Sequence, residues 1–339
     1  MTVHIGIIGA GMIGTDHGRR LTDAVAGASV VAVTDVDAER AASLATNLDA
    51  RALPNGHDVI NDPRVDAVVV TSWGPTHADY VLAAIEAGKY VFCEKPLATT
   101  AEDCLRITDA EQAAGRRLVQ VGYMRRYDAG YRAMKRAIDA GDIGRPLIMH
   151  CAHRNPAVPE SYRSEMAAHD TAVHEIDTIR WLLDDEIVGT QVRTPRPTSN
   201  RFEHLHDPQI ILFETAGGVH IDVEVFVNCQ YGYDIQCETV GERGAVRLPD
   251  PAGAIVRREG LLRTDVLQGW KERFADAFHA EFAEWVHSVR DGQLTGASAW
   301  DGYAAAVICE TTVESLHTGR RLGVQLKDMP DFYQHGGMP

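Results

Sequence analysis

The stretch that decides the fold is Val3-His4-Ile5-Gly6-Ile7-Ile8-Gly9-Ala10-Gly11-Met12-Ile13-Gly14. Its first half is an apolar run that predicts a buried strand, and the segment from Thr15 to Leu21 has the composition of a helix start. A second apolar run, residues 29–34, ends at Asp35, about 20 residues after the glycines. The order strand, glycine turn, helix, strand and carboxylate predicts a dinucleotide-binding unit, whereas the glycines alone would also suit a structural turn.

Each glycine of the G-x-G-x-x-G pattern has its own task in such a unit. Gly9 permits the tight turn, Gly11 lets the backbone approach a pyrophosphate, and Gly14 lets helix and strand pack closely. The pyrophosphate is expected at the helix N-terminus, where free N–H groups and the helix dipole favour an anion. The residues expected to bind the cofactor are Gly9, Gly11, Met12, Ile13, Gly14, Asp35, Thr71, Glu94 and Lys95.

The carboxylate at the end of the second strand predicts NAD rather than NADP. Asp35 is placed to accept hydrogen bonds from the adenosine ribose and to repel a 2′-phosphate. Asp37 and Glu39 add to that repulsion, and Arg40 opposes it.

Composition narrows the class of protein. With 339 residues the chain is expected to form two domains, and its formal net charge of −15 argues against nucleic acid and anionic membranes as partners. No leader or membrane-spanning run is evident, and the six cysteines form no CxxC pair or dense disulfide framework. These features predict a cytoplasmic protein with reduced thiols.

The pattern of elements changes after Gly122. Up to that point strands such as 67–71, 90–93 and 118–121 alternate with helices, which predicts an α/β domain with a doubly wound parallel sheet of the Rossmann type. Beyond it several strands follow one another without helices between them, which predicts an α+β domain with a large, mainly antiparallel sheet. We therefore expect a dinucleotide-binding domain at 1–122 and a substrate-binding and oligomerisation domain at 123–339.

One strand of the second domain predicts an open sheet face. Residues 219–227 alternate apolar and mostly polar side chains, and Gly217-Gly218 before them is a hairpin signal. The polar face is available to solvent, a substrate or another subunit.

Two sites have the residues needed for proton transfer. Glu94-Lys95-Pro96 follows a strand of the first domain, where ligands of doubly wound sheets bind, although a solvated loop lysine would look the same. Asp170 and His174 are four residues apart, and on a helix they share a face with Asp177 one turn further on. A carboxylate beside an imidazole suits a general base near neutral pH, while a capping Asp and a hydrogen-bonded structural His remain the simpler alternative.

Other chemistries have weaker support. A metal site is the alternative interpretation, with His153, His169 and His174 as its ligands. No HExxH motif is present, and we predict no metal site. Cys93 falls in a predicted buried strand, which favours an inert thiol, and no GxSxG motif occurs.

Taken together, the glycine pattern, Glu94-Lys95-Pro96 and the helix with Asp170, His174 and Asp177 resemble the glucose–fructose oxidoreductase/inositol dehydrogenase (Gfo/Idh/MocA) family over nearly the whole chain. Further stretches resemble its bacterial inositol 2-dehydrogenase subgroup: Gly122-Tyr123-Met124-Arg125-Arg126-Tyr127-Asp128, His153-Arg154-Asn155-Pro156, Tyr231-Gly232-Tyr233 and Ser298-Ala299-Trp300-Asp301-Gly302-Tyr303.

The resemblance implies roles for particular residues. Lys95, Asp170 and His174 would be the catalytic group, and the Lys95-Pro96 bond would be cis. Contacts to substrate hydroxyls would fall to Arg125, His153, Asn155, Asp177, Tyr231 and Tyr233. The implied activity is NAD-dependent oxidation of a cyclitol ring hydroxyl, with myo-inositol as the expected substrate. The resemblance also implies a homotetramer that is assembled through the open sheet. The alternatives are a family member acting on scyllo-inositol, an inosamine or a sugar, and a non-catalytic dinucleotide-binding regulator.

Overall fold

The computed structural model describes residues 2–250 and 254–334, and these divide into two compact units. Unit 1 holds the residues up to 123, then 278–307 and those from 326 on, while unit 2 holds 124–277 and 308–325. The chain thus leaves unit 1 twice and returns to it twice.

Unit 1 is built on a six-stranded parallel sheet with the order β3-β2-β1-β4-β5-β6. This confirms the doubly wound sheet, because the strand order reverses between β1 and β4. The strands are β1 Val3–Ile8, β2 Ala28–Thr34, β3 Arg51–Ala52, β4 Ala67–Val70, β5 Tyr90–Glu94 and β6 Val119–Gly122. The helices are α1 Met12–Asp23, α2 Ala38–Asn47, α3 Gly56–Asn61, α4 His77–Glu86 and α5 Ala101–Ala113, with a short 3-10 turn, η1 Gly74–Thr76.

The core of unit 1 takes side chains from a late part of the chain. The apolar face of α9 (Ala275–Asp291) supplies Phe282, Trp285 and Val286, all 1% exposed or less. The ring of Phe282 lies 4.4 Å from that of Phe92 on β5, centroid to centroid. The remaining late elements are α8 Trp270–Arg273, α10 Ala299–Thr318 and α11 Asp331–Gln334.

Unit 2 is built on a seven-stranded sheet with the order β12-β11-β7-β10-β9-β8-β15. The strands are β7 Pro146–Arg154, β8 Ile187–Arg193, β9 Gln209–Thr215, β10 His220–Phe226, β11 Asp234–Gly241, β12 Ala245–Arg247 and β15 Leu322–Gly323. All neighbours are antiparallel except β7 and β10, which run parallel. The mainly antiparallel sheet is confirmed, and the one parallel pair arises because β7 enters the sheet between β10 and β11.

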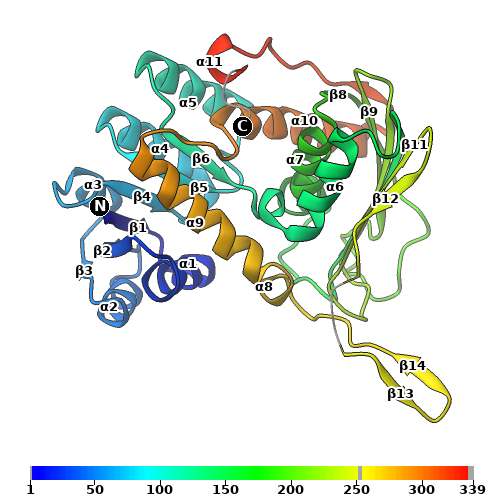
Figure 1. Cartoon of the computed structure of the whole chain (residues 1–339), viewed down its shortest axis with the longest axis horizontal. Helices are drawn as coiled ribbons and strands as arrows, with labels where there is room; N and C mark the ends of the chain where they lie inside the picture. Colours follow the sequence, from blue (N-terminus) through cyan, green and yellow to red (C-terminus); the bar gives the residue numbers. More distant parts are fainter. Residues whose placement is uncertain (1, 251–253, 335–339) are drawn as a thin grey trace. The chain divides into compact units, whose positions relative to one another are not determined.

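The sheet of unit 2 has one packed and one open face, as the alternation of residues 219–227 predicts. On β10, Ile221, Val223 and Val225 are at most 2% exposed, while Asp222 and Glu224 are partly exposed. Figure 1 shows α6 (Ala129–Asp139) and α7 (Val173–Leu183) on one side of the sheet. The open face of the sheet therefore follows from the alternation of side chains along its strands and from the position of these two helices on the other face.

The helix that carries Asp170 and His174 is not uniform. A π-helical turn, η3 Ala167–Ala172, precedes α7, and a 3-10 turn, η2 Met124–Tyr127, precedes α6. A π-turn has more residues per turn than an α-helix, so the simple i, i+4 relation assumed for this pair does not apply through η3. Insertions of this kind are frequent at functional sites.

Two further features complete the fold. A separate two-stranded hairpin in unit 2 joins β13 Val256–Arg258 to β14 Leu261–Arg263. Across 2–250 and 254–334, none of the helices has both the length and the apolar character needed to cross a bilayer.

Candidate active site

The glycine turn of unit 1 has the geometry of a phosphate cradle. Gly9 has φ +106°, and a Cβ there would lie 2.6 Å from the backbone of Thr71 and Ser72. A Cβ on Gly14 would lie 1.9 Å from the carbonyl oxygen of Gly9, so neither position accepts a side chain. A Cβ on Gly11 would meet nothing within 4 Å, which leaves space above the turn for a ligand.

The start of α1 suits an anion. Its N-cap is Gly11, no side chain caps it, and its first turn has no acidic residue. The free N–H groups and the dipole at this end therefore favour a phosphate. The residues present fit the cofactor predicted from the sequence.

Asp35 supports the glycine turn. One carboxylate oxygen accepts a hydrogen bond from the N–H of Ala10 (2.6 Å), and the other accepts one from the N–H of Asp37 (2.9 Å). The guanidinium of Arg40 lies 3.5 Å from Asp35, with half of its side chain exposed. The carboxylate thus fixes the loop on which the phosphates would lie.

Two further predicted residues stand at the ends of β4 and β5. The hydroxyl of Thr71, directly after β4, donates to the carbonyl of Gly9 (2.7 Å). Glu94, the last residue of β5, is 9% exposed and accepts from the N–H of Lys95 (3.1 Å). The Lys95-Pro96 bond is cis, which confirms the expectation drawn from the family resemblance.

A buried histidine that sequence reasoning missed holds Glu94. His17 on α1 is fully buried, and its Nε2 lies 2.8 Å from Oε1 of Glu94. Arg20 lies 3.0 Å from the other ring nitrogen and can donate to it, so Nε2 is the nitrogen that donates to Glu94. This pair ties the first helix to the strand end before Lys95. Its only sequence signal is a histidine among apolar residues, which more often indicates a core position.

In unit 2 a buried carboxylate that the sequence analysis did not single out organises several predicted residues. Glu175 is 1% exposed and lies 2.5 Å from the guanidinium of Arg125 and 3.1 Å from Nδ1 of His153. Burial alone would raise the pKa of Glu175, but Arg125 and His153 lower it to about 2. Glu175 is therefore ionised at neutral pH although it is buried.

His153 connects that anion to Tyr233. Nδ1 of His153 lies 3.1 Å from both Glu175 and Arg125, and Nε2 lies 3.4 Å from the hydroxyl of Tyr233. Burial raises the pKa of Tyr233 to about 12, which keeps its hydroxyl protonated. The ring of His174 lies 6.3 Å from that of His153, centroid to centroid. The structure thus brings His153, His174, Tyr233 and Arg125 together around Glu175.

Asp170 and Asp177 flank His174 along the chain. Asp170 lies in the π-turn and is partly exposed, and His174, in the first turn of α7, is 9% exposed. Asp177 is 1% exposed and accepts a bidentate pair of hydrogen bonds from Arg126, at 3.0 and 2.6 Å. Arg126, the residue after Arg125, therefore balances the negative charge of Asp177.

Asn155 and Tyr231 are the remaining residues predicted to bind substrate, and they lie in different places. Asn155 follows β7, and its backbone N–H donates to Phe226 (2.9 Å), with its side chain partly exposed. Tyr231 is 47% exposed, and its hydroxyl contacts Asp234 and Arg154, whose side chains project on the open face of the sheet. The structure does not bring Tyr231 to the Glu175 cluster, because the strand alternation sends Arg154 and His153 to opposite faces.

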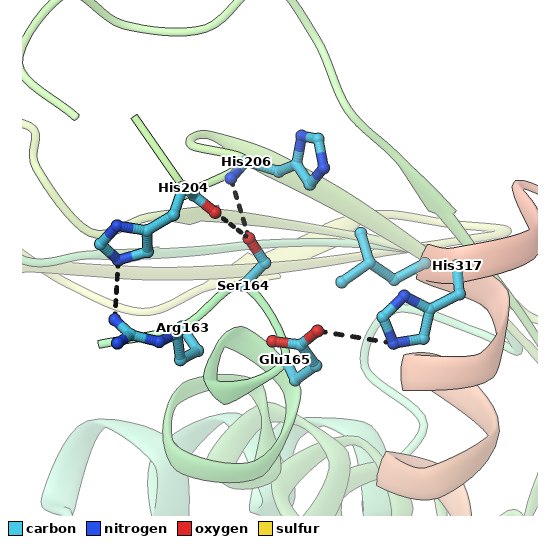
Figure 2. A pocket seen from close by; sticks show the side chains of 7 residues that line it. Arg163, Ser164, Glu165, His204, His206 and His317 are labelled. Atoms are coloured by element: carbon cyan, nitrogen blue, oxygen red, sulfur yellow. Dashed lines mark hydrogen bonds and ion pairs between the residues drawn. The ribbon is translucent and has the colours of Figure 1, made fainter. Parts of the chain in front are cut away.

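A cavity of about 370 Å³ in unit 2 lies apart from these residues. Figure 2 shows its lining from three segments, with His204 and His206 from one loop, Arg163 and Glu165 before η3, and His317 near the end of α10. Ser164 accepts from the N–H of His206 (2.9 Å), and Glu165 lies 3.5 Å from His317. None of the predicted site residues lines this cavity, and its contacts hold the segment that leads into η3.

The described residues give little support to metal or thiol chemistry. Within 2–250 and 254–334, no group of three or more His, Cys, Asp or Glu side chains is arranged to hold a metal ion. All six cysteines are free thiols. Cys93 is fully buried, and burial raises the pKa of its thiol, so it matches the inert residue expected from its strand position.

Comparison with known proteins covers both units. Residues 3–123 match "Oxidoreductase family, NAD-binding Rossmann fold", and residues 135–326 match the C-terminal alpha/beta domain of the same family. A protein of Saccharopolyspora erythraea called inositol 2-dehydrogenase 3 is 68% identical over 333 residues, which cover 98% of each chain. An inositol 2-dehydrogenase of Pseudomonas fluorescens is 54% identical over 98% of this chain and 100% of its own.

A solved structure matches equally completely. The myo-inositol dehydrogenase of Lactobacillus casei, in complex with NAD(H) and myo-inositol, has a TM-score of 0.96 and 42% identity. The match covers 98% of this chain and 100% of that one.

Proposed function

Because the chain belongs to the Gfo/Idh/MocA oxidoreductase family, we propose that it is an NAD-dependent dehydrogenase that oxidises myo-inositol to 2-keto-myo-inositol (scyllo-inosose). The observation that carries this proposal is the 68% identity, over nearly the full chain, to a protein called inositol 2-dehydrogenase 3. The cluster around Glu175 supports it, since imidazole and phenol groups are suited to hydroxyls.

NAD, when bound, supplies the hydride acceptor for this reaction. Gly9, Gly11 and Gly14 hold its pyrophosphate, with the N–H groups of Met12 and Ile13 at the start of α1. Asp35 takes the ribose hydroxyls, and Thr71, Glu94 and Lys95 border the same turn through their strand ends.

Proton transfer falls to residues of unit 2. His174 removes the proton of the reacting hydroxyl, and Asp170 orients His174 and stabilises its protonated form. Lys95 donates a hydrogen bond to the oxygen as negative charge develops on it. His153, Asn155, Asp177 and Tyr233 bind the other hydroxyls of the ring.

Arg125 acts differently from a direct substrate ligand in this proposal. Its guanidinium is 1% exposed and occupied by Glu175, so it acts by keeping that carboxylate ionised. Tyr231 has the weakest support as a substrate ligand, because its hydroxyl is held by Asp234 and Arg154.

The proposal extends to organisation and location. We assign dinucleotide binding to 1–122 and substrate binding and assembly to 123–339, with a homotetramer that uses the open sheet face. The free thiols suit a reducing cytoplasm.

The test is the rate of NADH formation with a panel of polyols: myo-inositol, scyllo-inositol, an inosamine, a neutral hexose and a myo-inositol phosphate. We expect the highest kcat/KM with myo-inositol and poor use of the phosphate, because Arg125 and Arg126 are already paired with Glu175 and Asp177. A better kcat/KM with the phosphate contradicts the substrate assignment, and NAD binding without turnover of any polyol contradicts the enzyme assignment.

A further inference from the structure

The hairpin β13–β14 is isolated within unit 2. In the sheet topology of 2–250 and 254–334 the two strands pair only with each other, with Val256 opposite Arg263, Arg257 opposite Leu262 and Arg258 opposite Leu261. Figure 1 shows it as a yellow projection beyond β12. A lone two-stranded hairpin is marginally stable in water, so it needs a surface to pack against.

This hairpin exposes large apolar side chains. Leu261 and Leu262 are 66% and 64% exposed, Ile255 is 60% exposed, and Val256 and Val266 exceed 40%. We call residues 254–267, which contain them, the arm. Contiguous exposed apolar side chains of this kind mark interaction sites or aggregation hazards.

Arginines accompany the apolar side chains on both faces of the arm. By the strand register, Val256, Leu261 and Arg263 project to one face, and Arg257 and Leu262 project to the other. Residues 256–263 hold three arginines and one glutamate, in a chain with 33 basic and 48 acidic residues. The complement of the arm is thus an apolar surface bordered by carboxylates.

We propose that the arm packs on a second copy of this chain, and that this contact fixes the position of Tyr233. The acidic balance of the chain supplies the charge that complements the arginines, and the same balance opposes binding to an anionic membrane. The arm also follows β12 in the chain, and β12 is the edge strand of the sheet whose open face we propose for assembly. The inference goes beyond the proposed function, because it names a contact segment and its effect on the site.

The returning end of the arm is built into the site. The N–H of Tyr233 donates to the carbonyl of Leu267 at 2.6 Å. Gly232 has φ +150°, and a Cβ there would lie 2.5 Å from a methyl group of Val266, so the two segments pack without room for a side chain. Because the hydroxyl of Tyr233 reaches His153, holding the arm also holds the Tyr233–His153 contact.

The test compares assembly and arm protection in the full-length protein. Leu261→Asp/Leu262→Asp removes the apolar contact, and Ala113→Asp/Ala114→Asp, at exposed positions near the end of α5, adds the same charge as a matched control. Light scattering gives the mass against concentration, and hydrogen exchange gives the protection of amides in the arm. We expect the arm variant to need at least about tenfold more protein to assemble, a factor that corresponds to about 1.4 kcal/mol.

In the unmodified protein, arm amides are expected to gain protection with assembly, and kcat per chain is expected to fall on dilution while NAD affinity stays constant. Arg257→Glu/Arg258→Glu keeps the leucines and is expected to weaken assembly as well. Identical mass curves for the arm variant and the control, or unprotected arm amides in the assembled protein, would overturn the docking. Binding of the arm to anionic vesicles by a protein that stays monomeric would also overturn it, and a kcat independent of assembly would overturn the link to Tyr233.

These measurements separate the arm from the proposed function. Mass and exchange need no substrate, so a protein inactive on every polyol still reports whether the arm docks. Activity on myo-inositol with an arm that never docks would refute only the inference made here.

Discussion

Glu175 holds His153 with both carboxylate oxygens, each of which lies 3.1 Å from Nδ1 of that ring. Nδ1 of His153 also lies 3.1 Å from the guanidinium of Arg125, and Nε2 faces Tyr233. Because Arg125 supplies the balancing charge at 2.5 Å, the group depends on three buried partners at once.

Replacing Glu175 by Gln is expected to destabilise unit 2 by about 3–5 kcal/mol, because Arg125 is left as an unpaired buried charge. The pKa of Glu175 is lowered from 4.5 to about 2, so the stability it contributes is present above pH 4.5 and lost as the pH falls toward 2. The free energy of unfolding, measured with denaturant from about pH 7 down to about pH 3, should fall more steeply for the unmodified protein than for Glu175→Gln.

The control for this result is the double variant Arg125→Met/Glu175→Gln, which removes both charges. We expect it to be more stable than the single Glu175→Gln, since no uncompensated guanidinium remains. Equal acid sensitivity in the unmodified protein and Glu175→Gln would mean that Glu175 is not the carboxylate that titrates with unfolding.

His174→Ala is expected to lower kcat by about 10²–10⁴-fold, the range for loss of a general base, with NAD affinity unchanged. His169→Ala is the matched control, because His169 lies in the π-turn five positions earlier and has no proposed part in proton transfer. Steady-state rates and NAD titration of both variants are the measurements that test whether His174 is the general base. A near-normal kcat for His174→Ala would place the base elsewhere.

Asp35→Ser is expected to narrow the preference for NAD over NADP, because it removes the charge that repels a 2′-phosphate. It also removes the acceptor for the N–H of Ala10, so affinity for both cofactors should fall. Asp109→Ser is the control, because it removes the same charge from an exposed position on α5 and not from the end of β2. The ratio of kcat/KM values for the two cofactors is the measurement, and equal use of both by the unmodified enzyme would refute the assignment.

Phe226→Asp, on the open face of the sheet, is expected to reduce the assembled mass while unit 1 still binds NAD. Arg136→Gln, at an exposed position of α6, gives a control with the same charge change of −1. Sedimentation at micromolar concentration distinguishes the outcomes, and a mass of 37.1 kDa for the unmodified protein would show that no such assembly forms.

Much of the fold can be predicted from the chain because its signals are local. The run Val3–Ile8 with the glycines after it determines strand, turn and helix within a few residues, and unbroken apolar runs are typical of strands buried on both faces. The alternation of residues 219–227 likewise predicts an open sheet face, which the exposure of β10 confirms.

The features that escaped prediction depend on distant contacts. The π-turn η3 has no propensity signal of its own, and the parallel pairing of β7 with β10 joins residues about 70 positions apart, such as His150 and Asp222. Glu175 stood beside His174 in the sequence, but only its burial against Arg125 and His153 distinguishes it from an ordinary surface glutamate.

The return of the chain to unit 1 sets an order of events during synthesis. Domains tend to fold as they emerge from the ribosome, N-terminal part first. Here the sheet that emerges first lacks Phe282, Trp285 and Val286 until α9 has been made, so its apolar surface waits for nearly the whole of unit 2 to be translated. The part of the protein that begins the chain is therefore among the last to be finished, and a ribosome stalled before α9 would carry an uncovered core that a chaperone can bind.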